Sequence, residues 1–151
     1  MMTSIFNNSD LEKTIQRVKG LSPETKAIWG KMDVAQMLAH CNVTFEMAYE
    51  DIHPKPGAFK KVLLKMFVKK AVVGPKPYPK NSPTASQFKI TSTKDFKKEQ
   101  ARLIDYLTKT YSLGADHFEG KDYHSFGTLT SKEWDMMFTK HLDHHLQQFG
   151  K

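Results

Sequence analysis

The sequence predicts an all-α fold, a four-helix bundle in which one long crossover joins the second helix to the third. Two observations support this prediction. Apolar residues recur at helical spacing in four segments, and no segment shows the alternation with flanking turns that is typical of a β-hairpin. The chain has 151 residues, of which 39% are hydrophobic and 26% charged. These values fit a soluble globular protein with one core, so we expect residues 1–151 to form a single domain.

Capping signals mark the start of two predicted helices most clearly. The four helices are predicted to cover residues 10–19, 34–50, 94–111 and 131–149. Asp33 and Gln36 have the spacing of a capping box, in which each side chain bonds the other residue's backbone N–H, and so do Thr130 and Glu133. We therefore expect the second and fourth helices to begin directly after Asp33 and Thr130.

The ends of the other two helices have weaker signals. Ser9 can cap the first helix, because a serine hydroxyl accepts from the free N–H groups of a first turn. The third helix can start from Ser92 with Asp95, or from Thr93 alone, and Gly114 lies just past its predicted end. These signals predict that both helices exist but define their boundaries less sharply.

The long connection between the second and third helices covers residues 51–91 and holds two proline clusters. Between these clusters, residues 58–73 predict a short extra helix. Its apolar side consists of Phe59, Val62, Leu63, Met66 and Phe67. Connections of this length are uncommon in a compact domain unless they cross it or carry function, and bundles with one long crossover are a known layout.

The net charge of +7 is concentrated in the same connection. Much of the excess comes from Lys55, Lys60, Lys61, Lys65, Lys69, Lys70, Lys76 and Lys80. The chain has only two arginines, Arg17 and Arg102, and no recognisable nucleic-acid motif accompanies the lysines. We expect no nucleic-acid partner.

Two interpretations of the basic segment 58–73 remain open. The segment can lie on an anionic membrane, or it can pack its apolar side on the bundle and leave its lysines in solvent. Membrane anchoring normally needs a large exposed apolar face, which favours the second interpretation and predicts no membrane partner. No apolar run approaches a membrane span, residues 1–8 lack the features of a signal peptide, and Cys41 is a single cysteine. Together these features predict a cytoplasmic protein.

Two histidines of the fourth predicted helix lie on its apolar face. His141 and His145 fall within about 20° of Trp134 on a helical wheel of 3.6 residues per turn. Their spacing of four residues places one imidazole a turn above the other, so that both can bind one metal ion. The alternative is a pair of hydrogen-bonded core histidines.

A third ligand is expected from a facing helix, because two ligands rarely make a tight site. His40 lies inside the second helix, beside its apolar stripe and near the polar Thr44. Gln148 and Thr44 are candidates to hold the histidine rings in place, and Trp134 is a candidate to line a pocket, although aromatic residues at helical spacing usually belong to a core. The catalytic residue is unknown; Asp143 and Glu46 are candidates by position alone.

Several stretches of the sequence are similar to a known superfamily. Residues 30–41 resemble the entry of the second helix in the DinB/YfiT-like metalloenzymes, and residues 141–149 resemble the last-helix motif of that superfamily. The stretches 124–134 and 80–84 resemble one branch, catalogued as domain of unknown function 1569. The resemblance covers about residues 21–149. Ser125 departs from it, since the branch usually has proline there, but this position lies in a loop.

The resemblance implies a DinB-like four-helix bundle whose metal ligands here are His40, His141 and His145. It also implies a divalent metal, most often nickel or zinc, an open coordination position and frequent homodimers. The expected function is a metal-dependent thiol transferase or hydrolase that takes a small-molecule substrate or a low-molecular-weight thiol. The alternative is a non-catalytic metal-binding or stress-response bundle.

Overall fold

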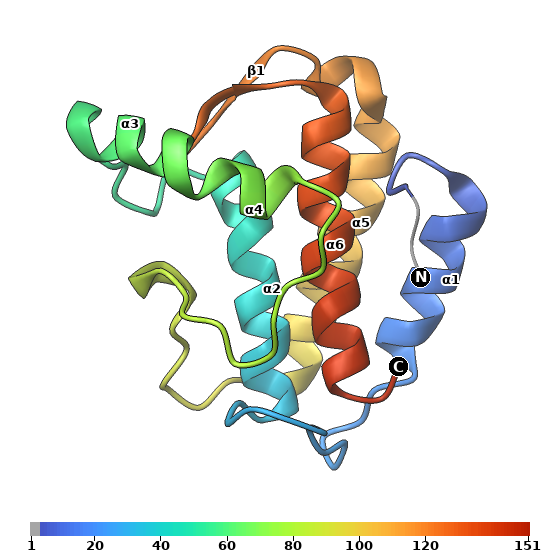
Figure 1. Ribbon diagram of the computed structural model, residues 1–151. Coiled ribbons are helices and arrows are strands. Elements are labelled where there is room, and N and C mark those ends of the chain that lie inside the picture. Colours follow the sequence, from blue (N-terminus) through green and yellow to red (C-terminus); the bar gives the residue numbers. More distant parts are fainter. Residues whose placement is uncertain (1–3) are drawn as a thin grey trace.

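The computed structural model describes residues 4–151 and is mostly helical with one small two-stranded sheet (Figure 1). Residues 1–3, part of the stretch in which no signal peptide is predicted, lie outside the described residues. The elements in chain order are α1 (Asn8–Lys19), α2 (Val34–Tyr49), α3 (Ala58–Phe67), α4 (Lys69–Val73), the 3₁₀ turn η1 (Ser86–Phe88), α5 (Phe96–Phe118), β1 (Lys121–Tyr123), β2 (Gly127–Leu129) and α6 (Ser131–Gln148).

Both predicted capping boxes are confirmed. In α2, the Asp33 side chain accepts from the Gln36 backbone N–H at 2.8 Å, and the Gln36 side chain accepts in return from the Asp33 N–H at 3.1 Å. Thr130 and Glu133 make the same pair of bonds at the start of α6. These caps fix the first turn of the two helices that carry the candidate ligands.

The starts of α1 and α5 differ from the simplest sequence signals. Asn7, and not Ser9, caps α1 by accepting from the backbone N–H of Asp10 at 3.1 Å. Asp95 caps α5. This helix continues to Phe118 across a kink at Gly114, whose φ of 75° is open to glycine but strained for other residues. Several adjacent residues able to cap compete at both starts, and sequence spacing alone does not choose between them.

The hairpin β1–β2 is absent from the all-α prediction, which is wrong at this point. The two strands pair antiparallel, with Tyr123 opposite Gly127 and Lys121 opposite Leu129. Strands of three residues are too short to show period-2 alternation. Tyr123 lies with its ring centroid 5.4 Å from that of Trp134, so the hairpin packs on the first turn of α6.

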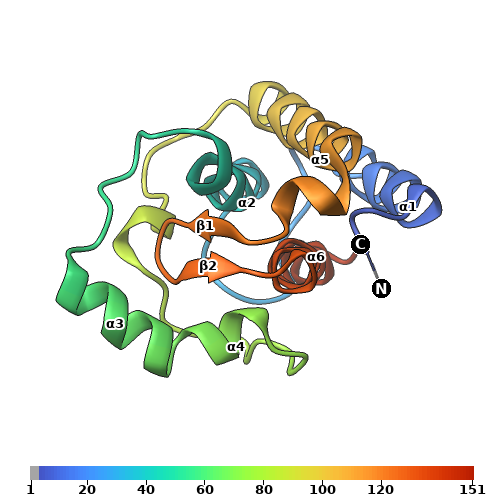
Figure 2. The ribbon, with the colours of Figure 1, turned by 90° about the horizontal axis from the view of Figure 1, so that it is seen from above.

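Helix α2 lies at the centre of the helical body. It contacts both α5 and α6, and α5 also packs against α1 (Figure 2). Residues on nearly all sides of α2 are buried, polar ones included. The core contains aromatic stacks such as Phe45 on Phe138, with ring centroids 4.8 Å apart. The faces of α2 and α6 that carry the candidate ligands meet on the side of this core that η1 covers.

The predicted crossover helix is divided at Val68 into α3 and α4. Leu64 is half-buried and packs against the core, while the opposite, apolar side of α3 is exposed. The expectation that this apolar side packs on the body is therefore wrong. Within residues 4–151, no helix combines the length and apolar character needed to cross a bilayer.

Candidate metal centre

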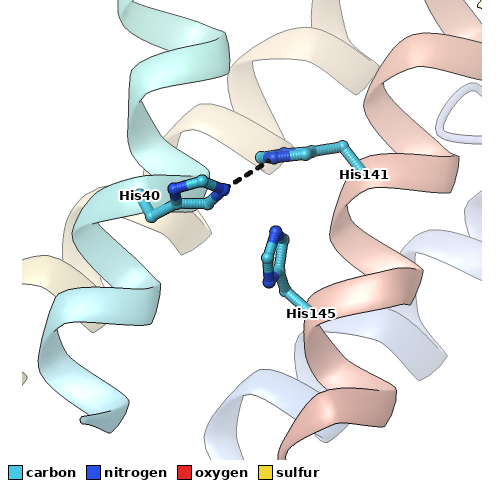
Figure 3. Close-up of side chains that lie close together, drawn as sticks. All are labelled: His40, His141 and His145. Carbon is cyan, nitrogen blue, oxygen red and sulfur yellow. Dashed lines mark hydrogen bonds between the residues drawn. The ribbon is translucent and has the colours of Figure 1, made fainter. Parts of the chain in front are cut away.

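Three histidine rings converge between α2 and α6 (Figure 3). His40 comes from α2, and His141 and His145 come from successive turns of α6. The Nε2 atoms of His40 and His141 lie 3.0 Å apart, and each of the three rings offers one nitrogen within 4.8 Å of the others. His40 and His145 are buried and His141 is half-buried. The structure thus brings together the three predicted ligands.

Two of the three rings have their second nitrogen fixed as a donor. The Nδ1 of His40 lies 2.8 Å from the carbonyl oxygen of Phe88, which can only accept. The Nδ1 of His145 lies 2.8 Å from Oε1 of Gln148, whose amide nitrogen donates to the Trp29 carbonyl at 2.7 Å. Both Nδ1 atoms therefore carry the proton, and in the neutral rings both Nε2 atoms present a lone pair.

The third ring has a partner that can either donate or accept. The Nδ1 of His141 lies 3.0 Å from the hydroxyl of Thr44. When His141 carries its proton on Nε2, it donates to His40 and accepts from Thr44. When the proton moves to Nδ1, it donates to Thr44 instead, and the Nε2 lone pair is free for a cation. The threonine hydroxyl supports both tautomers.

The surroundings keep all three rings neutral at physiological pH. Burial lowers the pKa of His40, although the hydrogen bond to Phe88 acts in the opposite direction. Burial and the nearby His145 and His40 hold the pKa of His141 well below its usual value. Burial and the nearby His40 lower the pKa of His145 to about 3. Protons consequently compete little with a metal for these nitrogens near pH 7.

The donor set fits a divalent metal of the zinc or nickel type. Imidazole nitrogens bind such ions at about 2.0–2.1 Å, which places two ligands of a tetrahedral site roughly 3.3 Å apart. The separations at this site, from 3.0 Å to within 4.8 Å, lie on both sides of that value. Three neutral rings whose lone pairs converge have no donor among themselves except the single shared proton, so a cation would satisfy all three.

Aromatic side chains cover the cluster on its outer side. The ring of Phe88 in η1 lies 5.3 Å from that of His40 and 5.6 Å from that of His141. Tyr78 lies 6.4 Å from His141, and Lys140 is over the Tyr78 ring. Lys140 also donates to three backbone carbonyls, those of Ala71, Gly74 and Lys76. The crossover therefore forms one wall of the site.

Trp134 lies outside the histidine cluster. It is buried two turns away on α6 and packs in the aromatic core against Phe118, Tyr123 and Phe138. Cys41 is also buried in the core, and burial raises the pKa of its thiol. Of the three residues predicted to surround the ligands, the structure places Gln148 and Thr44 beside the histidines and Trp134 in the core.

The remaining histidines and the candidate carboxylates have other partners. His53 pairs with Glu46 at 2.8 Å, and His124 bonds the His53 and Pro54 carbonyls. The ring of His144 lies at the flank of the cluster, edge-on to the ring of His145. His117 lies 2.7 Å from Lys121. Asp143 pairs with Arg17 at 2.7 Å, and Glu46 pairs with Arg102 at 2.5 Å.

Two residues contribute to the site in a way that their residue type does not reveal. Phe88 and Trp29 act through their backbone carbonyls, which every residue possesses. A signal does exist next to Trp29: Gly30 has a φ of 85°, and a Cβ there would overlap the Gln148 amide. A glycine before the second helix could therefore have indicated a close backbone approach.

The fold and the site define a mostly helical protein with a buried cluster of three histidines that could hold a metal ion. The chain belongs to the family described as protein of unknown function (DUF1569), whose family model matches residues 4–151. Neither the curated proteins nor the solved structures gave a significant match.

Proposed function

We propose that this protein binds a divalent metal ion, nickel or zinc, through Nε2 of His40, His141 and His145. One observation supports this proposal above all. Acceptors behind the rings of His40 and His145 hold the proton on Nδ1, so that each Nε2 presents a lone pair. The Nε2 of His141 lies 3.0 Å from that of His40. Lone pairs that converge in a buried position repel each other unless a cation or a proton lies between them.

Three protein ligands leave a coordination position for a small molecule, as in catalytic and not in structural zinc sites. We propose that this position serves a metal-dependent thiol transferase or hydrolase, within a DinB-like four-helix bundle formed by α1, α2, α5 and α6. A bound divalent ion would act as a Lewis acid. It would lower the pKa of a bound thiol or water, so that the thiolate or hydroxide forms near neutral pH. The substrate would be a small molecule or a low-molecular-weight thiol.

The protein's own residues would hold and shield such a centre. The Phe88 carbonyl, the Thr44 hydroxyl and the Gln148 amide orient the three rings from behind. The Phe88 ring lies against both His40 and His141 and would shield the centre from water on that side. A rigid second layer of this kind commonly raises metal affinity.

A second candidate is a metal-binding protein without catalysis. The observation in its favour is that the two carboxylates considered as general bases, Asp143 and Glu46, are engaged by Arg17 and Arg102. Turnover with a metal-activated thiol needs no separate carboxylate base, whereas hydrolysis usually benefits from one. The two candidates therefore differ in what the loaded protein does with a thiol substrate.

The first experiment measures bound metal by elemental analysis in protein purified without a polyhistidine tag. We expect nearly one equivalent of nickel or zinc in the wild type and its loss in His141→Ala. His144→Ala is the matched control, because it removes an adjacent imidazole outside the cluster and should retain the metal. A wild type that takes up none of the tested divalent ions would refute the metal centre.

A second measurement separates the enzyme from the passive binder. The metal-loaded wild type is offered small thiols with electrophilic acceptors, and separately activated esters and amides. Turnover that His141→Ala loses and His144→Ala keeps supports catalysis. Full metal occupancy without turnover on either class favours the non-catalytic alternative.

A further inference from the structure

Helix α3 presents an apolar face to solvent along its whole length. Phe59 is 78% exposed and Phe67 is 73% exposed, and Val62, Leu63 and Met66 between them are exposed as well. The spacing of these five residues places them on one side of the helix, within an arc of about 140°. No residue of α3 is buried. A face of this size on a ten-residue helix indicates an interaction surface.

The opposite side of α3 holds the helix to the body, so the apolar face points outward. Leu64 packs against the core, and Lys61 pairs with Asp122 of the hairpin at 3.2 Å. Lys69 at the start of α4 pairs with Glu133 at 2.8 Å. Figures 1 and 2 show α3 at the rim of the molecule, away from the other long helices. The face is thus oriented by contacts on its far side.

The charge around this face has one sign. Residues 52–94 contain ten lysines and no aspartate or glutamate, while all 16 acidic residues of the chain lie elsewhere with the other 13 basic ones. The positive net charge of the protein is therefore carried by this segment alone. Lys60 and Lys65 flank the apolar face on its two edges, and both are exposed.

We propose that α3 docks in the plane of an anionic lipid bilayer, with its two phenylalanines among the acyl chains and its flanking lysines at the phosphate level. Apolar burial and attraction to anionic headgroups add in such a helix. Long lysine side chains reach the headgroups while their stems remain in apolar surroundings. The proposal is independent of the metal centre.

The charge distribution favours a lipid surface over a second copy of the chain. Two copies joined through α3 would bring their lysine-rich segments together, which costs free energy at low salt. An acidic protein would need a groove shaped to receive five projecting side chains, whereas acyl chains adapt to them. Self-association through α3 is a distinguishable outcome of the test.

The test is sedimentation with vesicles of phosphatidylcholine, either pure or with 30% phosphatidylglycerol, at low salt. We expect the wild type to bind the anionic vesicles, and the double substitution Phe59→Glu, Phe67→Glu to weaken binding at least about tenfold. The double substitution Lys60→Gln, Lys65→Gln, and separately about 0.5 M salt, should each weaken binding several-fold.

The control is Ile28→Glu, which adds one of the two negative charges of the phenylalanine variant at another apolar side chain, 67% exposed, outside the crossover. It should bind vesicles as the wild type does. Absence of wild-type binding to the anionic vesicles would overturn the proposal. So would binding that the lysine variant loses and the phenylalanine variant keeps, since charge alone would then explain it. A dimer in light scattering that only the phenylalanine variant abolishes, without vesicle binding, would instead assign α3 to self-association.

Discussion

Helix α2 carries two buried polar clusters on two of its faces, and they differ in how their polar groups are satisfied. Toward α6, His40 and Thr44 join the histidine cluster. Toward α5, Glu46 accepts from Arg102, which also donates to Glu99. We define Asn42, Glu46, His53, Glu99 and Arg102 as the carboxylate cluster, because Asn42 donates to Glu99 and His53 bonds Glu46.

The carboxylate cluster finds its counter-charge within the chain. Arg102 donates to both acids, so their charges are paired by a side chain of the protein itself, and this pairing joins α2 to α5. In the histidine cluster, by contrast, the partners behind the rings leave the Nε2 lone pairs of His40 and His145 at the centre, where one proton, on Nε2 of His141, is the only donor among the three rings. A buried cluster of the first kind stabilises the packing of its helices, whereas one of the second kind is compatible with a bound cation.

The largest expected effect is on the carboxylate cluster. Arg102→Met should lower the free energy of unfolding by about 3 kcal/mol, because it leaves two buried carboxylates without their cation. Urea denaturation measures this loss, and bound metal should be unchanged. Lys55→Met, which breaks an exposed pair with Asp51, is the control and should cost less than about 1 kcal/mol. Equal losses in both variants would contradict the structural role of the carboxylate cluster.

The next effect is the pH dependence of the metal-free protein. In the unfolded chain histidines titrate near 6.5, whereas the pKa of His145 in the folded chain is about 3. Between these values the unfolded state binds more protons, so stability falls as pH falls. His145 alone should cost about 2 kcal/mol between pH 7 and pH 5. Unfolding in the presence of a chelator tests this, and His145→Asn should flatten the slope; an equally steep slope in that variant would assign the effect to other groups.

A smaller effect concerns the hydroxyl that holds His141. Thr44→Val keeps the shape of the side chain but removes the partner of Nδ1, so metal affinity should fall roughly tenfold. Thr14→Val is the matched control, since Thr14 is also buried in a helix and bonds only the Asp10 carbonyl. Competition with a chromophoric chelator measures both affinities. Identical affinities in the two variants would show that Thr44 does not orient the ring.

Local sequence signals predicted the parts of the fold that depend on neighbouring residues. The capping boxes at Asp33 and Thr130 act over three residues, and both were predicted at the correct position. The convergence of the three histidines was predicted because helical spacing and the family resemblance agreed on the same positions. Spacing along a helix determines which side chains share a face, and this does not depend on how the helix packs.

The features that were missed depend on contacts between distant segments. The amphipathic pattern of α3 predicts that it has two sides, but not which side the body covers, because that depends on contacts with the hairpin and α6. The carbonyl of Phe88 reaches His40 only through the path of the crossover. The strands β1 and β2 are stabilised by packing of Tyr123 on Trp134, and not by a pattern of their own.

The smallest expected effect tests whether the backbone position that lies against Gln148 supports the proposed metal site. Gly30 has a φ of 85°, and a Cβ there would overlap the amide nitrogen of Gln148, the residue that fixes the proton of His145. Gly30→Ala should therefore displace Gln148 and weaken metal binding about threefold, in addition to a backbone strain of about 1 kcal/mol. Gly120→Ala separates the two terms, because Gly120 has a φ of 70° with open space around its Cβ position. Gly120→Ala should lose stability by a similar amount and keep its metal affinity. If both variants bind metal as tightly as the wild type, the Gln148 amide does not support the ligand, and His145 is held by its helix alone.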